Sequence, residues 1–244
     1  MNDLEFVQAT SGLINQYGSA FYFAPATLAK GEELGLDTFG FYALGRGGVL
    51  GDVEPAVVSA AFGYFNPSLV AHLWNKGKAI VAPRVAGAAY VECCAEHGRS
   101  VFTGVEGLDA FVAAGEKVLA ACEVEAFPLF AAIAAEPAAT DVAGRAMQLL
   151  AVLREYRGCA HLVALRAVGV RSKDAHFVKR PNDVKMFGWA ETDAPVIDDA
   201  LLGRMAEAEA LTDRIVLPAF AVLDQAERAA MVAGLAAVGA ALAG

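Results

Sequence analysis

Segments rich in Ala and Leu, with apolar residues at helical spacing, recur along almost the whole chain. The clearest of them cover residues 4–18, 107–122, 127–135 and 141–168. Apolar residues that repeat every three to four positions are typical of helices that pack one face against a core. Alternating Val, Ile and Thr residues, which indicate strands, are confined to residues 78–81 and 99–103. The sequence therefore predicts an all-α fold with a mostly helical body.

Proline and capping residues mark where several of these helices begin. Pro25 suits the first turn of a helix that stops near Gly35, and Asp52 suits the N-cap of a helix that runs toward Tyr64. Asn66 and Pro67 then interrupt the pattern before a further helix. The first third of the chain is thus predicted to hold several short helices.

Charge is distributed unevenly near the C-terminus. Residues 171–190 hold five Lys or Arg against two Asp, and predict a loop or short hairpin. Residues 191–213 hold seven acidic residues against Arg204, and predict an acidic helix. We predict two domains, a helical N-terminal domain over residues 1–140 and a helical C-terminal domain over residues 141–244.

Net charge and the start of the chain limit the classes of partner and compartment. With 19 basic and 28 acidic residues the net charge is −9, which repels a phosphate backbone and disfavours nucleic acid as a partner. The first ten residues lack the basic and apolar regions of a secretory signal, which favours a cytoplasmic location. Residues 229–244 are too short and too rich in Ala and Gly for a membrane span. We expect a packed core helix there, with a seam between the subunits of a homodimer as the alternative.

Neither a metal site nor a cofactor is predicted. His72, His97 and His176 are scattered, and no HExxH motif is present. The four cysteines lack the paired spacing of a structural zinc site, and we expect them to be reduced thiols.

The strongest functional signal is a group of charged residues inside an apolar run. Residues 147–165 are mostly apolar but contain Arg154, Glu155, Arg157 and His161. Burying a charge costs several kcal/mol unless it is paired or binds a ligand, so the group calls for a physical reason.

A helical wheel places most of this group on one inward face. Arg154, Arg157, Gly158 and His161 fall within an arc of about 100° that begins and ends with apolar residues, and Glu155 lies to the side. Such a face is expected to line an internal cavity. Two guanidinium groups and an imidazole suit a carboxylate, a phosphate or another anion, and Gly158 allows a ligand to approach the backbone.

Further candidate ligand-binding residues come from the first third of the chain. Residues 44–51 place Arg46 among four glycines, which predicts a structural turn, with a ligand-contacting turn as the alternative and a phosphate loop disfavoured. Tyr22, Tyr42 and Tyr64 belong to an aromatic region that either packs the core or lines a pocket for a flat, apolar metabolite.

Two interpretations of the charged group remain open. In the first, it orients a ligand, and His161 with Glu155 as indirect orienter could also perform acid–base catalysis. In the second, it is an internal ion-pair network in which Glu155 and an acid from another helix, such as Asp213 or Glu54, neutralise the arginines.

Several segments resemble a helix-turn-helix family of actinobacteria, whose members are labelled regulator-like proteins of the MarR type. The resemblance rests on YFAP (22–25), GRGGVLG (45–51), FGYFNPSLV (62–70), LREYRGCAH (153–161) and EALTDR (209–214). It implies an all-helical body with a winged-helix-like, degenerate C-terminal portion, and it implies no catalytic residues. Cys159 stands where the resemblance leads us to expect aspartate, and residues 170–211 are short for a recognition helix plus wing.

These observations lead to three functional hypotheses. The first is a small-molecule-binding protein whose pocket orients an anionic or polar, partly aromatic metabolite. The second is an enzyme that acts on such a metabolite through His161. The third is a ligand-responsive transcriptional regulator, which the net charge disfavours.

Overall fold

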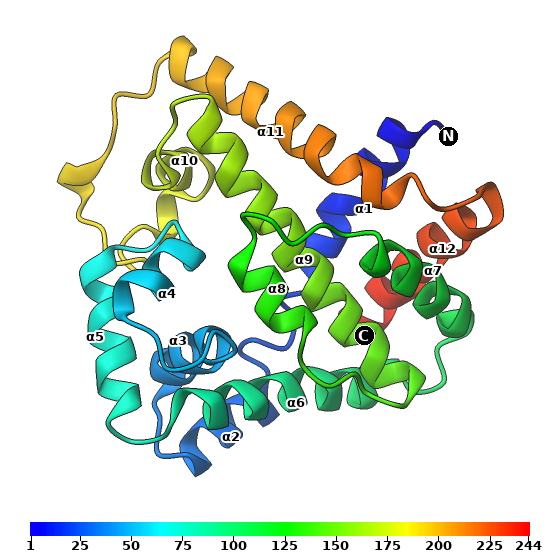
Figure 1. The fold of residues 1–244 in the computed structure, drawn as a ribbon, viewed down its shortest axis with the longest axis horizontal. Coiled ribbons are helices and arrows are strands. Elements are labelled where there is room, and N and C mark those ends of the chain that lie inside the picture. Colours follow the sequence, from blue (N-terminus) through cyan, green and yellow to red (C-terminus); the bar gives the residue numbers. More distant parts are fainter.

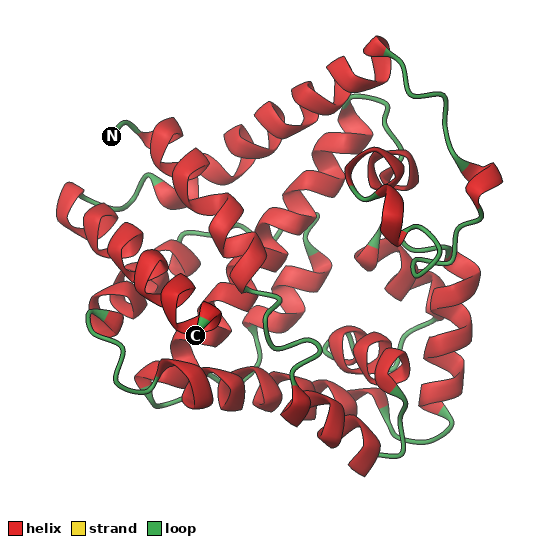
Figure 2. Ribbon diagram, turned by 180° about the vertical axis from the view of Figure 1, so that it is seen from behind, coloured by secondary structure: helices red, strands yellow, loops and turns green.

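The computed structural model describes all 244 residues and is helical throughout, without any strand (Figure 2). The predicted all-α fold is therefore confirmed, and no β-hairpin wing is present. The α-helices are α1 (Asp3–Tyr17), α2 (Pro25–Glu33), α3 (Thr38–Gly48), α4 (Pro55–Phe62), α5 (Pro67–Lys78), α6 (Pro83–Phe102), α7 (Leu108–Ala120), α8 (Pro128–Ala134), α9 (Val142–Ala167), α10 (Ser172–Lys179), α11 (Asp199–Phe220) and α12 (Gln225–Ala243). Two short 3₁₀-helices, η1 (Pro181–Asp183) and η2 (Glu191–Asp193), lie between α10 and α11.

Helix α9 runs through the centre of the molecule, and the other helices surround it (Figure 1). It packs against α6, α11, α1, α7 and α8. The consecutive residues Leu149, Leu150, Ala151 and Val152 point in four directions around α9, and all four are buried. Helix α9 is therefore a core helix rather than a surface helix with one apolar face.

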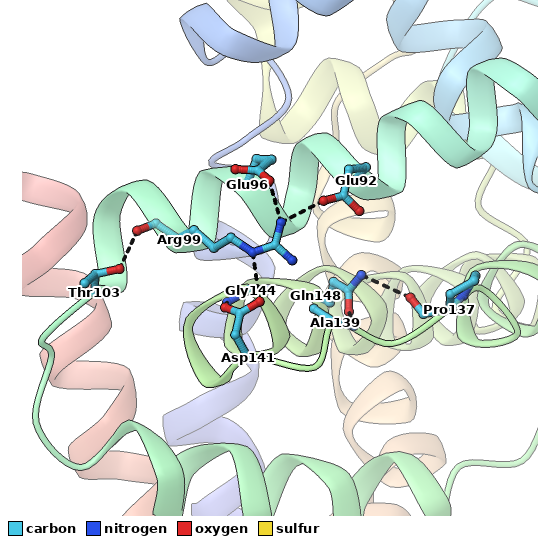
Figure 3. Close-up of polar contacts among 9 residues, drawn as sticks. All are labelled: Glu92, Glu96, Arg99, Thr103, Pro137, Ala139, Asp141, Gly144 and Gln148. Atoms are coloured by element: carbon cyan, nitrogen blue, oxygen red, sulfur yellow. Dashed lines mark hydrogen bonds and ion pairs between the residues drawn. The ribbon is translucent and has the colours of Figure 1, made fainter.

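The start of α9 is fixed by polar contacts to α6 (Figure 3). The Asp141 carboxylate accepts the Gly144 N–H at 2.7 Å as an N-cap, and it also accepts the Arg99 Nε–H at 2.8 Å. One turn further on, Gln148 accepts the Ala139 N–H at 2.7 Å and donates to the Pro137 carbonyl at 3.3 Å. These bonds satisfy backbone groups at the helix start and hold the preceding loop.

The main core contains 42 buried residues and extends from Phe6 to Val238 in sequence. It includes residues on both sides of position 140. A second cluster of 7 buried residues joins the C-terminal end of α9 to α10 and α11. The division into domains at residues 1–140 and 141–244 stays a prediction.

Three local predictions were wrong. Residues 78–81 comprise the last residue of α5 and the turn after it, and residues 99–102 are the end of α6, where Phe102 enters the core, so neither segment forms a strand. Residues 171–190 form α10 and η1 rather than a hairpin, and the acidic helix begins at Asp199 rather than near residue 191. The local alternation of residue types influenced the secondary structure less than the burial of an apolar side chain did.

The glycine-rich segment 44–51 is largely the end of a buried helix, not a turn. Gly45, Gly47 and Gly48 lie in α3. A Cβ atom at Gly48 would overlap the carbonyl oxygen of Pro83 and lie 2.9 Å from the Gly87 nitrogen. The glycines thus let the backbones of α3 and α6 approach each other closely.

Helix α12 has the length and mean hydropathy of a helix that could cross a membrane, and 28% of its most apolar window is buried. Core helices of soluble proteins meet the same criterion. Helix α12 packs against α7 and α1, and its Gly234 lies against the Phe111 ring. The expected helix at residues 229–244 is therefore present as part of α12, where it packs one side against α7 and α1 and leaves most of its residues outside the core.

Candidate functional site

A cavity of about 290 Å³ lies beside α9, between this helix and residues of α3, α4, α10 and α11. Most of the residues that the sequence singled out lie on its wall: Tyr42, Arg46, Tyr64, Arg154, Glu155, Arg157, Gly158 and His161. Tyr22 lies behind the wall and hydrogen bonds to two of them. The structure therefore brings together side chains from α3, α9 and the turn after α4.

The inner end of the cavity is formed by an ion-pair cluster centred on Glu155, which is 3% exposed. Its carboxylate accepts hydrogen bonds from Arg46 Nε at 3.0 Å, Arg46 Nη2 at 2.8 Å, Arg154 Nη1 at 3.0 Å and the Tyr22 hydroxyl at 2.9 Å. Arg154 also donates to the Tyr22 hydroxyl at 3.0 Å and to the Asn15 carbonyl at 3.2 Å. This cluster ties α9 to α3 and to the segment around Tyr22.

The electrostatics of this cluster keep Glu155 ionised. Burial alone would raise the pKa of Glu155, but the charges of Arg46 and Arg154, together with the hydrogen bonds, lower it to about 2. Burial raises the pKa of Tyr22, so its hydroxyl stays a hydrogen-bond donor to Glu155. Two guanidinium groups and one carboxylate leave this end with an excess positive charge.

The outer part of the cavity holds three more cations and one carboxylate. Arg157 Nη2 donates to Glu209 at 2.8 Å, and Lys179 Nζ lies 3.6 Å from the same carboxylate. Arg180 also lines the cavity. The Nε of Arg157 is buried and has no hydrogen-bond partner. Apart from Glu155 of the inner cluster, Glu209 is the only carboxylate on the cavity wall.

His161 lies on the same wall and bonds to α11. Its Nδ1 lies 2.8 Å from the Thr212 hydroxyl, and its Nε2 lies 4.0 Å from the Glu209 carboxylate. Burial lowers the pKa of His161, with Arg157 and Lys179 acting in the same direction and Glu209 and Asp213 opposing it. The imidazole makes no bond to Glu155, as the angular separation on the helical wheel predicts.

Aromatic rings form the opposite side of the cavity. Phe65 stacks on Phe187 at 4.1 Å between ring centroids, and His176 lies 4.0 Å from Phe187. Phe62 receives the Arg46 guanidinium over its face at 4.3 Å. His176 is 4% exposed, and its Nε2 has no hydrogen-bond partner.

Two details of the predicted arrangement were wrong. The wheel placed Glu155 to the side of the inward face, whereas it lies on the cavity wall at the centre of the inner cluster. The proposed partners Asp213 and Glu54 do not neutralise the arginines: Asp213 accepts from Gln8 at 3.3 Å, and Glu54 is the N-cap residue of α4. Arg157 pairs with Glu209 instead.

Sequence analysis did not assign Glu209, Thr212, His176, Lys179 or Phe187 to the site. Glu209 and Thr212 come from the EALTDR segment, which packs against LREYRGCAH of α9 through the Arg157 and His161 contacts. The positive charge of residues 171–190 pointed toward Lys179, because this segment holds most of the local basic residues. Nothing in the sequence indicated His176 or Phe187 as site residues apart from their aromatic rings.

The cationic side chains of the cavity can bind an anionic group, and the imidazole of His161 can accept or donate a proton. No group of three or more His, Cys, Asp or Glu side chains is placed to hold a metal ion. Cys159 lies on the wall, but burial raises its pKa to about 11, so it is a poor nucleophile near neutral pH.

Comparison with protein families gives one match. A family model described as a helix-turn-helix family matches residues 7–194, which contain the whole of α9 and α10. Comparison with curated proteins and with solved structures gave no significant match.

Proposed function

The chain belongs to the helix-turn-helix family that matches residues 7–194, and we propose that this member binds a small anionic molecule in the cavity beside α9. The observation that carries the proposal is the charge of the cavity wall. Arg46, Arg154, Arg157, Lys179 and Arg180 face only two carboxylates, those of Glu155 and Glu209, and five minus two leaves an excess of three positive charges. A bound carboxylate or phosphate offsets that excess.

The inner and outer cations differ in how well the protein already pairs them. Arg46 and Arg154 are held by Glu155, Tyr22 and a backbone carbonyl, which makes the inner cluster an internal ion-pair network. Of the three outer cations, Arg157 and Lys179 share Glu209, and Arg180 has no ion pair. We assign the ligand's anionic group to the outer cations.

Two buried nitrogen atoms without partners support this assignment. Buried polar side-chain atoms in folded proteins nearly always have a hydrogen-bond partner, from the protein, from water or from a ligand. Arg157 Nε and His176 Nε2 lack one, and both residues lie on the cavity wall. A ligand oxygen between α9 and α10 would complete these bonds.

The aromatic wall indicates the rest of the ligand. Phe65, Phe187 and Phe62 present ring surface to the cavity, which suits a planar or apolar group. The proposed ligand is therefore an organic acid or phosphate with a partly aromatic or apolar body.

Native mass spectrometry of the freshly purified full-length protein tests the proposal. We expect a bound mass of a few hundred daltons that is lost in Arg157→Gln, because this variant removes the cation with the free Nε. Arg166→Gln is the matched control, since Arg166 lies on the exposed side of the same helix and should leave the bound mass in place. Retention of the mass in a folded Arg157→Gln protein, or no bound mass in wild type, contradicts the proposal.

A further inference from the structure

The hydroxyl of Thr212 makes two short contacts that together determine where its proton lies. Its Oγ1 lies 2.7 Å from the carbonyl oxygen of Ala208, one turn earlier in α11, and 2.8 Å from Nδ1 of His161. A carbonyl oxygen only accepts, and a hydroxyl carries a single proton. Thr212 therefore donates to Ala208, and its oxygen accepts the N–H of His161 Nδ1.

This pairing determines the tautomer of neutral His161. A neutral imidazole has one N–H, so a proton at Nδ1 leaves a lone pair at Nε2. Nε2 has no hydrogen-bond partner within the protein; the Glu209 carboxylate, 4.0 Å away, lies beyond hydrogen-bond distance. Glu209 and Asp213 favour a second proton on the ring, whereas Arg157, Lys179 and burial oppose it, and the pKa of His161 is lowered.

The free lone pair of Nε2 lies on the same wall as three cationic side chains. Arg157, Lys179 and Arg180 only donate, and Glu209 already accepts from Arg157. An acceptor set among donors favours a ligand that has an anionic group and a hydrogen-bond donor at separate positions. A ligand that places an ether or methyl group against Nε2 leaves this acceptor without a partner.

We propose that Thr212 is a positioning residue that holds His161 with its proton on Nδ1, so that Nε2 accepts a hydrogen bond from a hydroxyl group of the bound anion. The inference rests on the proposed function, and it narrows the ligand to a hydroxylated, partly aromatic organic acid. Thr212 itself is fully buried and does not line the cavity, so it acts through His161.

The tautomer is testable without any ligand. Nitrogen NMR of the imidazole groups distinguishes a protonated from an unprotonated ring nitrogen, and His161→Gln assigns the signal among the 4 histidines. We expect Nδ1–H in the wild type and in Thr212→Ser, and loss of this preference in Thr212→Val, which keeps the shape of the side chain. A wild-type signal from Nε2–H, or an unchanged signal in Thr212→Val, overturns the role of Thr212.

Matched aromatic acids test the ligand. The probes are 3- and 4-hydroxyphenylacetate, the corresponding methoxyphenylacetates and phenylacetate, with affinities from isothermal titration calorimetry. At least one hydroxylated acid should bind about tenfold more tightly than its methoxy counterpart, a difference that one hydrogen bond can supply. This difference in affinity between hydroxy and methoxy acids should disappear in Thr212→Val and persist in Thr212→Ser.

The outcomes separate this inference from the proposed function. Equal affinity of hydroxy and methoxy acids, or no binding of any hydroxylated acid, overturns the proposed ligand chemistry. If the co-purified mass is nevertheless lost in Arg157→Gln, the proposed function stands and only the inference fails. If Nδ1–H is observed but no mass is bound, the role of Thr212 stands and the proposed function fails.

Discussion

The carboxylate of Glu155 accepts two hydrogen bonds from one guanidinium, at 3.0 Å from Arg46 Nε and 2.8 Å from Arg46 Nη2. The two side chains are 3% and 9% exposed. The contact joins α9 to α3 at the inner end of the cavity. Because both charges are buried away from water, each is stabilised mainly by the other. Removing one leaves an uncompensated charge in the core.

Replacing Glu155 by Gln is therefore expected to destabilise the fold. The free energy of unfolding should fall by about 3–5 kcal/mol, since Arg46 and Arg154 lose their shared counter-ion. Urea denaturation followed by circular dichroism measures the change. Glu191→Gln breaks the exposed ion pair with Lys185 and should leave the stability nearly unchanged, because solvent screens the pair. An equally small effect of Glu155→Gln would show that the inner cluster is not a structural ion-pair network.

Acid should weaken the fold through the same carboxylate. The pKa of Glu155 is lowered from an ordinary value of 4.5 to about 2, because the charges of Arg46 and Arg154 outweigh burial. A depressed carboxyl pKa contributes stability that is fully present above about pH 4.5 and is lost as the pH falls toward 2. Urea midpoints measured across that range should fall more steeply for the wild type than for Glu155→Gln. Parallel slopes in the two proteins would contradict this assignment.

The sequence predicted α9 and its inward residues because both depend on local information. Asp141 is a good N-cap, and the 3.6-residue period places Arg154, Arg157 and His161 on one side of the helix. The helical wheel gave the wrong location for Glu155, because α9 is buried on several sides and a residue beside the predicted inward face is still inside the protein. Position on a wheel predicts exposure only for a helix with one solvated face.

The partners of the charged group could not be predicted, because they depend on how helices cross. Glu209 and Thr212 reach α9 from a helix whose start was itself predicted several residues too early. The glycines of α3 were misassigned for a related reason. Local propensity favours a turn at Gly47 and Gly48, whereas close packing on α6 makes glycine necessary within a helix.

The close approach of α3 and α6 leads to a third prediction. Gly48→Ala places a Cβ atom against the backbone of Pro83 and Gly87, which no side-chain rotation relieves. We expect a loss of about 1–3 kcal/mol or more in the free energy of unfolding, as for overpacked cores. Gly203→Ala is the opposite case, since its Cβ meets nothing within 4 Å on the exposed side of α11, and should gain about 0.5–1 kcal/mol. A neutral Gly48→Ala would mean that α3 and α6 separate at little cost.

A substitution at Gly158 tests whether a ligand contacts this part of the cavity wall. It lies within α9 on the cavity wall, and the nearest atom to an added Cβ is a Glu155 carboxylate oxygen at 4.0 Å. Gly158→Ala therefore creates no overlap with the protein, and the better helix propensity of alanine should raise the free energy of unfolding by about 0.5–1 kcal/mol. The new methyl group occupies space beside Arg157 and His161, so the variant should retain less of the co-purified molecule in native mass spectrometry. Gly203→Ala provides the control, since it should gain stability in α11 without any change in retention. If Gly158→Ala were more stable and bound the molecule fully, the ligand would not contact this part of α9.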